Sequence, residues 1–150
     1  MGPSISELFN PADIVANLTA RNRQGVLFEM AELVARNHPE CARDKLAAAL
    51  QDRENDGSTG IGYGCAIPHV CFPGLKKTLI ALGRSAEGLE FGSLDKKPVH
   101  LFFMILAPES SQYLKILARI SQGLHNENFR QKLMAAATSH EIFSLLKEEF

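Results

Sequence analysis

Residues Arg53 to His69 read Arg-Glu-Asn-Asp-Gly-Ser-Thr-Gly-Ile-Gly-Tyr-Gly-Cys-Ala-Ile-Pro-His, and the rest of the chain is organised around this stretch. Its glycines permit positive φ and let the backbone approach a ligand closely. Successive N–H groups in such a turn form a concavity that binds anions. Pro68 fixes its own φ and favours an extended Ile67, so His69 is delivered at a defined place. A glycine-rich anion site that ends in a histidine suggests phosphate chemistry on the imidazole.

The familiar phosphate motifs do not account for this stretch. No Lys-Ser or Lys-Thr pair follows the glycines, which excludes a P-loop. The dinucleotide fingerprint needs Gly or Ala five residues after its first glycine, and the chain has Cys65 or Ile67 at those positions. The plainer alternative is a tight turn between a helix and a strand, with His69 as an ordinary histidine.

The order and spacing of the residues point to a known family. Gly-Ser-Thr-Gly-Ile-Gly at 57–62, followed by Ala-Ile-Pro-His at 66–69, closely resembles the phosphorylation-site signature of the enzyme IIA domains of the bacterial phosphotransferase system (PTS). The similar branch is the fructose/mannitol type, and the chain most resembles the stand-alone nitrogen-regulatory IIA proteins. The resemblance covers nearly the whole chain and includes three further segments: 53–54, 98–103 and 107–110.

The resemblance implies a role for His69. In that family the matching histidine accepts a phosphoryl group, through Nε2, from a phosphohistidine carrier protein, HPr or its paralogue. Imidazole suits this role because its unperturbed pKa of about 6.5 leaves it a neutral nucleophile near pH 7. One nitrogen attacks phosphorus, while the other holds its proton against an acceptor. The protein then mainly positions the transferring group, and no metal or other cofactor is expected.

Three neighbours are candidates to bind the phosphoryl group. Arg53 matches the family's active-site arginine, and a guanidinium grips phosphate oxygens in bidentate fashion. The alternative for Arg53 is a surface cation that favours a helix C-terminus. Ser58 and Thr59 offer hydroxyl and N–H donors to the phosphoryl oxygens, although both residue types are equally typical of caps and turns.

Two positions depart from the family pattern. Many members place a second histidine near the site, where this chain has Tyr113. Tyrosine donates a hydrogen bond to a phosphoryl oxygen but carries no positive charge, and its alternative is a half-buried helix aromatic. Val70 stands where members commonly have glycine after the active histidine.

A zinc site is the competing interpretation of Cys65, His69 and Cys71, because strand alternation would place all three on one face. The paired Cys-x2-Cys spacing of structural zinc is missing, so we expect no metal. We assign no chemistry to the remaining histidines: His38, His100, His125 and His140.

Composition narrows the class of protein. A length of 150 residues fits one domain, and we expect residues 1–150 to form a single IIA-like domain. Sixteen basic and 17 acidic side chains leave no basic excess for nucleic acid. No apolar run reaches the roughly 20 residues of a membrane helix, and the first residues do not read as a signal peptide. Three cysteines, an odd number, suit a reducing cytosol, so we expect a cytoplasmic protein.

The hydrophobic pattern predicts an α/β fold. Helical periodicity predicts helices over four segments: 21–37, 42–53, 110–125 and 128–137. Thr138 and Glu141 form a capping box for a last helix. Short apolar runs predict four strands: 13–18, 65–70, 78–84 and 99–107, the last of them central. The resemblance implies a mixed parallel/antiparallel sheet with helices on both faces, and the residues leave the strand order open.

These observations predict a phosphoryl carrier whose partner is an HPr-like protein. A free-standing chain favours a regulatory, nitrogen-type role in which phosphorylation changes binding to a target protein. The alternatives are a sugar-transport IIA that passes phosphate to a IIB cysteine, an interaction module that has lost phosphotransfer, and a zinc hydrolase. We expect an exposed apolar rim around His69, where the carrier docks.

Overall fold

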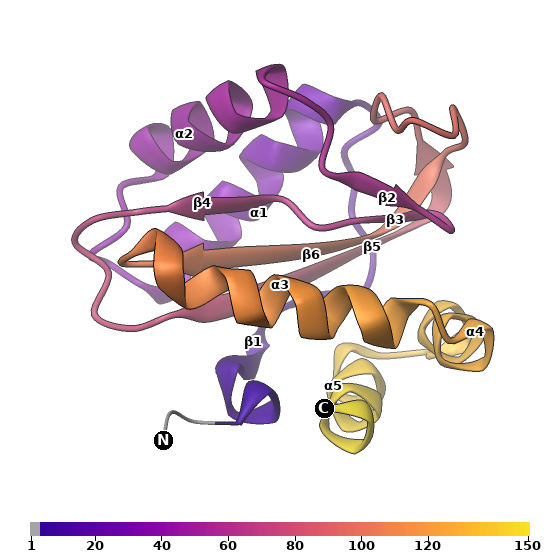
Figure 1. Ribbon diagram of the computed structural model, residues 1–150. Helices are drawn as coiled ribbons and strands as arrows, with labels where there is room; N and C mark the ends of the chain where they lie inside the picture. Colours follow the sequence, from indigo (N-terminus) through magenta and orange to yellow (C-terminus); the bar gives the residue numbers. More distant parts are fainter. Residues whose placement is uncertain (1–3) are drawn as a thin grey trace.

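The computed structural model describes residues 4–150. Met1, Gly2 and Pro3 lie outside the described residues. They belong to the single domain predicted over residues 1–150 and to the first residues, which were predicted not to be a signal peptide. The elements follow one another in this order (Figure 1): η1 (Ile5–Leu8), β1 (Phe9–Val15), α1 (Arg23–Asn37), α2 (Arg43–Asn55), β2 (Gly60–Gly62), β3 (Cys65–Ala66), β4 (His69–Cys71), β5 (Leu79–Leu89), β6 (Val99–Ala107), α3 (Ser110–Leu124), α4 (Glu127–Ala135) and α5 (Ser139–Glu149).

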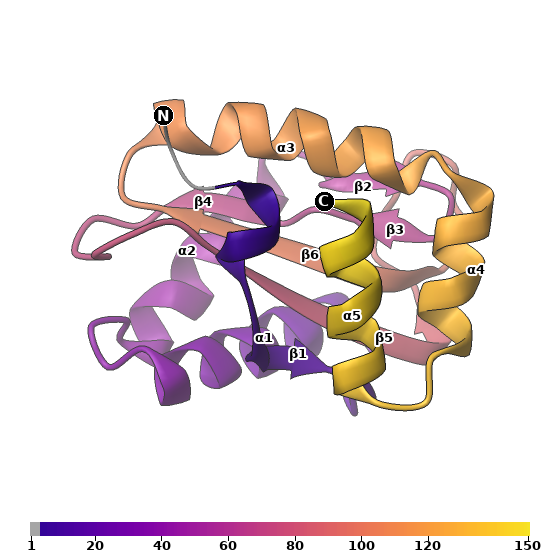
Figure 2. The same cartoon turned by 90° about the horizontal axis from the view of Figure 1, so that it is seen from below.

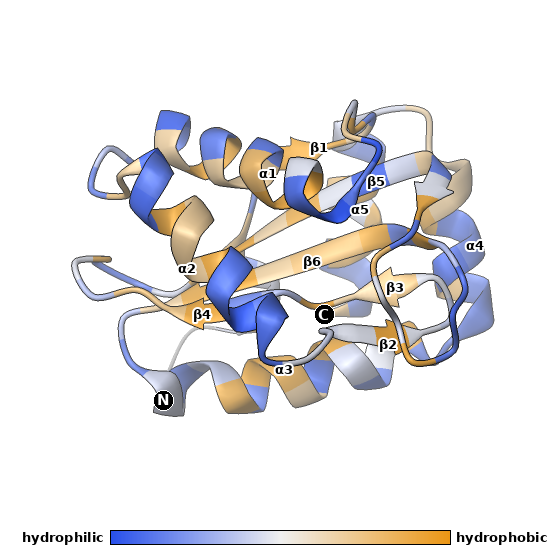
Figure 3. Ribbon diagram, turned by 90° about the horizontal axis from the view of Figure 1, so that it is seen from above, coloured by the Kyte–Doolittle hydropathy of each residue, from blue (hydrophilic) through white to orange (hydrophobic). Residues whose placement is uncertain are grey.

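The sheet is mixed, as the resemblance implied. Its strands lie in the order β1-β5-β6-β3-β2. β4 also pairs with β6, on the side of β6 that β3 occupies. β5 is antiparallel to β6, and β2 is antiparallel to β3, whereas β1 runs parallel to β5, and β3 and β4 run parallel to β6. Every residue of β6 except His100 is buried, and Figure 3 shows this strand mostly in hydrophobic colours. The prediction of a central strand over 99–107 is therefore confirmed.

Helices cover both faces of the sheet, which confirms the predicted fold class. The apolar sides of α1 and α2 form one hydrophobic core with the sheet, and those of α3, α4 and α5 form a second core on the other face. Figure 1 shows α1 and α2 above the sheet and α5 below it, and Figure 2 shows α5 crossing in front of β5 and β6. Within residues 4–150 no helix combines the length and the apolar character that crossing a bilayer requires.

Helix starts follow the local sequence. The side chain of Asn22 accepts a hydrogen bond from the N–H of Gly25 and so caps α1. Thr138 accepts from the N–H of Glu141 at 3.1 Å, and the Glu141 carboxylate accepts from the N–H of Ala137 at 2.7 Å. The predicted capping box is therefore present, although its return bond reaches the residue before the cap.

Two details around the glycine-rich stretch differ from prediction. The single strand predicted over 65–70 is two strands, β3 and β4, separated by Ile67 and Pro68. Proline has no N–H for a sheet ladder, but the Pro68 carbonyl accepts from the N–H of Ile105 at 2.9 Å, so β6 supports both strands. Gly60–Gly62, predicted only as a turn, forms β2 and pairs with β3.

The first strand also begins earlier than predicted. β1 starts at Phe9, four residues before the strand predicted over 13–18, and passes through Asn10-Pro11. Its register against β5 shifts between Phe9 and Ile14. An edge strand tolerates proline at such an irregularity because one side needs no hydrogen bonds.

A buried arginine joins the sheet to the C-terminal helices. Arg84 lies on β5, and its guanidinium donates to the carbonyls of Ala16, Leu133 and Ala136. The last two carbonyls belong to the end of α4 and the connection to α5. A cation is favourable at a helix C-terminus, so this side chain fastens α4 to the sheet.

Candidate active site around His69

His69 is the first residue of β4 and is held in register with Ile105 of β6. Its imidazole is half-buried, and Nδ1 lies 2.7 Å from the carbonyl oxygen of Ile67. Because a carbonyl oxygen only accepts, Nδ1 carries the proton and Nε2 carries the lone pair. No other residue within 4–150 forms a hydrogen bond to Nε2. The ring is therefore fixed in the tautomer that leaves Nε2 free to react.

Burial lowers the pKa of His69 below its ordinary value of 6.5. The positive charge of Arg53 acts in the same direction. The hydrogen bond to Ile67 and the carboxylate of Glu54 oppose both effects and raise the pKa, but burial is the largest influence. The imidazole is consequently neutral, and hence nucleophilic, around pH 7.

Four of the five predicted site residues line one cleft. The cleft has a volume of about 380 Å³ and lies between the end of α2, the loop into β2, the start of β4 and α3. Arg53, Ser58, Thr59 and His69 all contribute to its wall. The fifth predicted residue, Tyr113, stands beside it, with its ring centroid 5.2 Å from that of His69 and the two planes inclined by 52°.

Arg53 lies in the last turn of α2, as expected for a helix-ending cation, but it also faces the cleft. One guanidinium nitrogen donates to the carbonyl of Gly57 at 2.9 Å, which anchors the side chain to the glycine-rich loop. No other hydrogen bond of this guanidinium falls within the described part of the chain. The remaining donors are available to an anion beside His69.

The two hydroxyl residues behave differently. The hydroxyl and the N–H of Thr59 both donate to the carboxylate of Glu54, each at 2.7 Å, and are occupied in this structure. The Ser58 oxygen accepts from the N–H of Gly60 at 3.0 Å, and its own proton remains free to donate. Ser58 is therefore better placed than Thr59 for the phosphoryl contact that the sequence suggested for both.

Helix α3 supplies the apolar part of the cleft. Leu114, Leu117 and Ala118 line it together with Ile61 from β2. Leu114 also faces solvent, and 60% of this residue is exposed. An exposed leucine next to the imidazole agrees with the apolar rim expected around His69.

Sequence reasoning missed Glu54 and Ser121. Glu54 is only 2% exposed and accepts hydrogen bonds from Thr59 of the loop that lines the cleft, and Ser121 of α3 is among the lining residues. The only sequence feature that pointed to Glu54 was its place in the Arg-Glu pair at 53–54. Ser121 has the helical spacing of Leu114 and Leu117 but carried no signal of its own.

The cysteines near His69 do not form a metal centre with it. Cys65 is buried, and burial raises the pKa of its thiol to about 12. Cys71 is exposed, and its thiol donates to the carbonyl of Pro108. Within the described residues no three His, Cys, Asp or Glu side chains gather in a way that could hold a metal ion.

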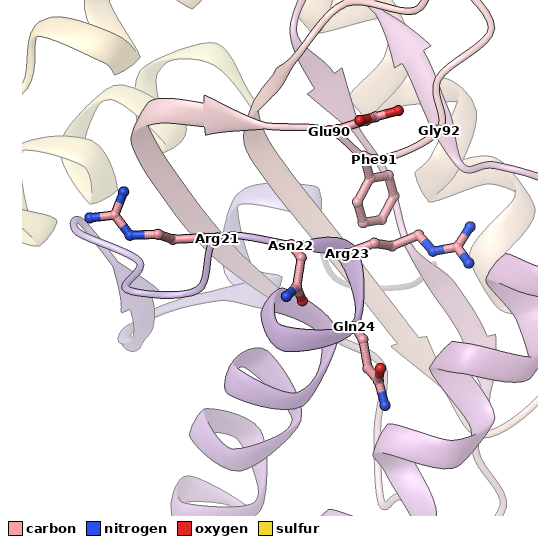
Figure 4. Close-up of a pocket in the computed structure, with 7 residues that line it drawn as sticks. All are labelled: Arg21, Asn22, Arg23, Gln24, Glu90, Phe91 and Gly92. Carbon is pink, nitrogen blue, oxygen red and sulfur yellow. The ribbon is translucent and has the colours of Figure 1, made fainter.

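A separate pocket of about 530 Å³ lies at the start of α1 and shares no lining residue with the His69 cleft. Figure 4 shows its two arginines pointing in opposite directions. Arg21 pairs with Glu87 at 2.9 Å, and Arg23 donates to Asn55 at 3.4 Å. The two cations do not converge on a common ligand.

Comparison with known proteins supplies an independent view of the chain. The model of a family described as "Phosphoenolpyruvate-dependent sugar phosphotransferase system, EIIA 2" matches residues 7–149. The PTS system fructose-specific EIIA component of Haloferax volcanii is 39% identical over 108 residues, which cover 71% of this chain and 70% of that protein. The nitrogen regulatory protein of Bradyrhizobium diazoefficiens is 35% identical over 144 residues, which cover 95% of this chain and 94% of the relative. The crystal structure of nitrogen regulatory protein IIA-Ntr from Neisseria meningitidis superimposes with a TM-score of 0.88 at 29% identity, covering 95% of this chain and 98% of that one.

Proposed function

Because this chain belongs to the EIIA 2 family of the phosphoenolpyruvate-dependent sugar phosphotransferase system, we propose that it is a phosphoryl carrier that accepts phosphate on His69. The donor is an HPr-like phosphohistidine protein. The chain thus acts as a phosphotransferase component with a covalent phosphohistidine intermediate, and residues 1–150 act as one IIA domain.

The transfer needs no metal and no net proton movement. The lone pair on Nε2 of His69 attacks phosphorus, and the P–N bond of the donor phosphohistidine breaks. The electron pair of that bond returns to the donor ring, which becomes a neutral imidazole. The His69 ring gains the corresponding positive charge while Nδ1 keeps its proton against the Ile67 carbonyl.

The observation that carries the proposal is the fixed tautomer of His69 in an open cleft with a guanidinium. The Nδ1–H bond to Ile67 directs the Nε2 lone pair outward, and the lowered pKa keeps that lone pair available at neutral pH. Arg53 on the same cleft wall offers charge to the phosphoryl oxygens. Ser58 and Tyr113 add hydroxyl donors at its edge, and Leu114 offers apolar surface to the docking carrier.

Within this function we propose the regulatory, nitrogen-type role. A relative whose match covers 95% of this chain and 94% of its own length is called a nitrogen regulatory protein. The 39% identity to a fructose-specific EIIA component favours the alternative, in which phosphate passes on to a IIB cysteine during sugar transport. The donor is charged from phosphoenolpyruvate, so we place the reaction in the cytoplasm.

The test is phosphorylation by enzyme I, an HPr-like carrier and labelled phosphoenolpyruvate. We expect the parent protein to take up label on His69, and His69→Ala to take up none. His140→Ala is the matched control and should label like the parent. His140 is exposed and lies far along the sequence from the residues that line the cleft. Equal labelling of His69→Ala overturns the site, and an unlabelled parent supports the phosphotransfer-inactive interaction module instead.

A second measurement separates the two roles. Label that moves on to a IIB acceptor indicates sugar transport. A regulatory role predicts that the phosphorylated and unphosphorylated proteins retain different partners from a lysate, because the phosphoryl group adds negative charge at the docking surface.

A further inference from the structure

Glu54 is a buried carboxylate that the proposed transfer does not use. It stands in the last turn of α2, one residue after Arg53. A negative charge is unfavourable at a helix C-terminus, and burial adds a further cost for a charged group. Local preferences therefore argue against glutamate here, and such exceptions tend to occur at functional sites.

The contacts of Glu54 lead step by step to His69. Its two oxygens accept from the hydroxyl and the N–H of Thr59. The carbonyl of Thr59 accepts from the N–H of Ile67 at 3.0 Å. The carbonyl of Ile67 accepts from Nδ1–H of His69 at 2.7 Å. These four residues form one hydrogen-bonded series, the Glu54 relay, with a carboxylate at one end and the imidazole at the other.

On the premise of the proposed function, we propose that Glu54 is a positioning residue for His69 that acts through Thr59 and Ile67. The relay holds the Ile67 carbonyl in place, and this carbonyl fixes the Nδ1–H tautomer. The Glu54 carboxylate also favours the positive charge that the ring gains when Nε2 is phosphorylated, because its negative charge acts through space and raises the pKa of His69.

The position of Thr59 explains why two acceptors are needed. A carboxylate accepts from a backbone N–H and a hydroxyl at the same time, one on each oxygen. A glutamine in the same place keeps one acceptor oxygen and removes the charge. Glu54→Gln therefore tests the charge with little change in shape, and Thr59→Val tests one link of the relay while the carboxylate stays.

The molecule contains a matched control for this substitution. Glu29 of α1 also accepts from the N–H and the hydroxyl of a threonine, Thr19, and additionally from the N–H of Ala20. Glu29 does not line the His69 cleft. Glu29→Gln thus makes the same chemical change to the same kind of contact outside the site.

The first readout is the titration of His69 followed by nuclear magnetic resonance of its ring. Arg53 and Glu54 from α2 and Tyr113 from α3 are the titratable groups around the ring. We expect Glu54→Gln to lower the midpoint of the His69 titration, because a carboxylate that favours the charged ring is gone. The ring nitrogens of this variant should also show less of the Nδ1–H tautomer. Glu29→Gln should leave both properties unchanged.

The second readout is the rate of phosphoryl uptake from the phosphorylated HPr-like carrier. We expect Glu54→Gln and Thr59→Val to lower the maximal rate by about ten-fold or more, the size of effect that follows when a metal-binding histidine loses its outer hydrogen-bond partner. The carrier concentration at half-maximal rate should stay the same, since the docking surface is intact. A purely structural role predicts parallel losses of rate and thermal stability instead.

The outcomes separate this proposal from the proposed function. An unlabelled parent overturns the phosphoryl carrier, while the His69 titration still decides whether Glu54 acts on the ring. A parent that labels, with a Glu54→Gln variant that matches it in rate and in midpoint, overturns the relay alone. If Glu54→Gln does not fold, Thr59→Val decides by the same two readouts.

Discussion

Replacing Gly60 by alanine is the sharpest test of how closely the loop beside His69 packs against its neighbours. Gly60 begins β2 and lines the cleft. A Cβ atom added there would lie 2.0 Å from Oγ of Ser93 and 2.9 Å from its Cβ. Turning the Ser93 hydroxyl away removes the first contact but leaves the second. The loop must therefore open by about 0.6–1.1 Å to restore an ordinary carbon–carbon distance of about 3.5–4.0 Å.

The size of this movement sets the expected effects. Overpacking of this kind lowers the free energy of unfolding by about 1–3 kcal/mol. A misplacement of up to about 1 Å near a reacting group costs up to about 100-fold in rate, so we expect Gly60→Ala to slow phosphoryl uptake by about 10- to 100-fold. Urea denaturation and the labelling assay measure the two effects.

A double-mutant cycle identifies the cause. Ser93→Gly removes both clashing atoms, so Gly60→Ala combined with Ser93→Gly should recover most of the lost rate. Gly83→Ala is the control, because its added Cβ would lie 2.8 Å from Leu18, a comparable clash at a residue that does not line the cleft, and it should transfer phosphate like the parent. A Gly60→Ala protein with parental stability and rate, or a double mutant no better than the single one, would refute the reasoning.

Four further predictions concern other groups. The Ser93 hydroxyl is buried and has no hydrogen-bond partner within the described residues, so Ser93→Ala should raise the free energy of unfolding by about 1 kcal/mol; a loss of stability in urea contradicts this. Tyr113→Phe keeps the ring beside His69 but removes the phenol, and should lower the uptake rate about two- to twelve-fold, the value of one neutral hydrogen bond; an unchanged rate shows that the phenol makes no such bond. Burial lowers the pKa of His69, so the unfolded chain binds more protons than the folded one just below pH 6.5, and the free energy of unfolding should fall as the pH drops through this window. Thermal denaturation of His69→Ala should therefore depend less on pH than that of the parent, and an identical pH dependence contradicts this prediction. Arg84→Met leaves buried carbonyls unpaired, among them that of Leu133, and should cost about 2–5 kcal/mol on denaturation; a change below about 1 kcal/mol shows that water replaces the guanidinium.

The sequence predicted those parts of the fold that depend on long periodic patterns. The apolar run over 99–107 identified β6, helical spacing identified four helices to within a few residues, and the capping box at Thr138 and Glu141 identified the start of the fifth. Short elements were not predicted because two or three residues are too few to show a periodic pattern. Gly60–Gly62 has poor strand propensity, yet it pairs with β3. The break between β3 and β4 at Ile67-Pro68 was not predicted, because β6 supports the chain on both sides of the break.

The sequence predicted which residues line the candidate site but not the contacts that support them. His69 was proposed from the glycine-rich stretch and its resemblance to the family signature, and Arg53 from that resemblance, and both line one cleft. The donors of Thr59 were expected to face the cleft, but they point backwards to Glu54. Such a contact depends on how a helix end meets the following loop. No periodic signal reports that junction.

The strand that carries the imidazole has a consequence for how partners arrive. β4 is three residues long, and within residues 4–150 its only strand partner is β6. So short an edge is a poor template for unwanted strand addition. For a phosphoryl carrier it also means that a visiting protein meets the reactive ring at the margin of the sheet, where backbone groups of only three residues could pair with it.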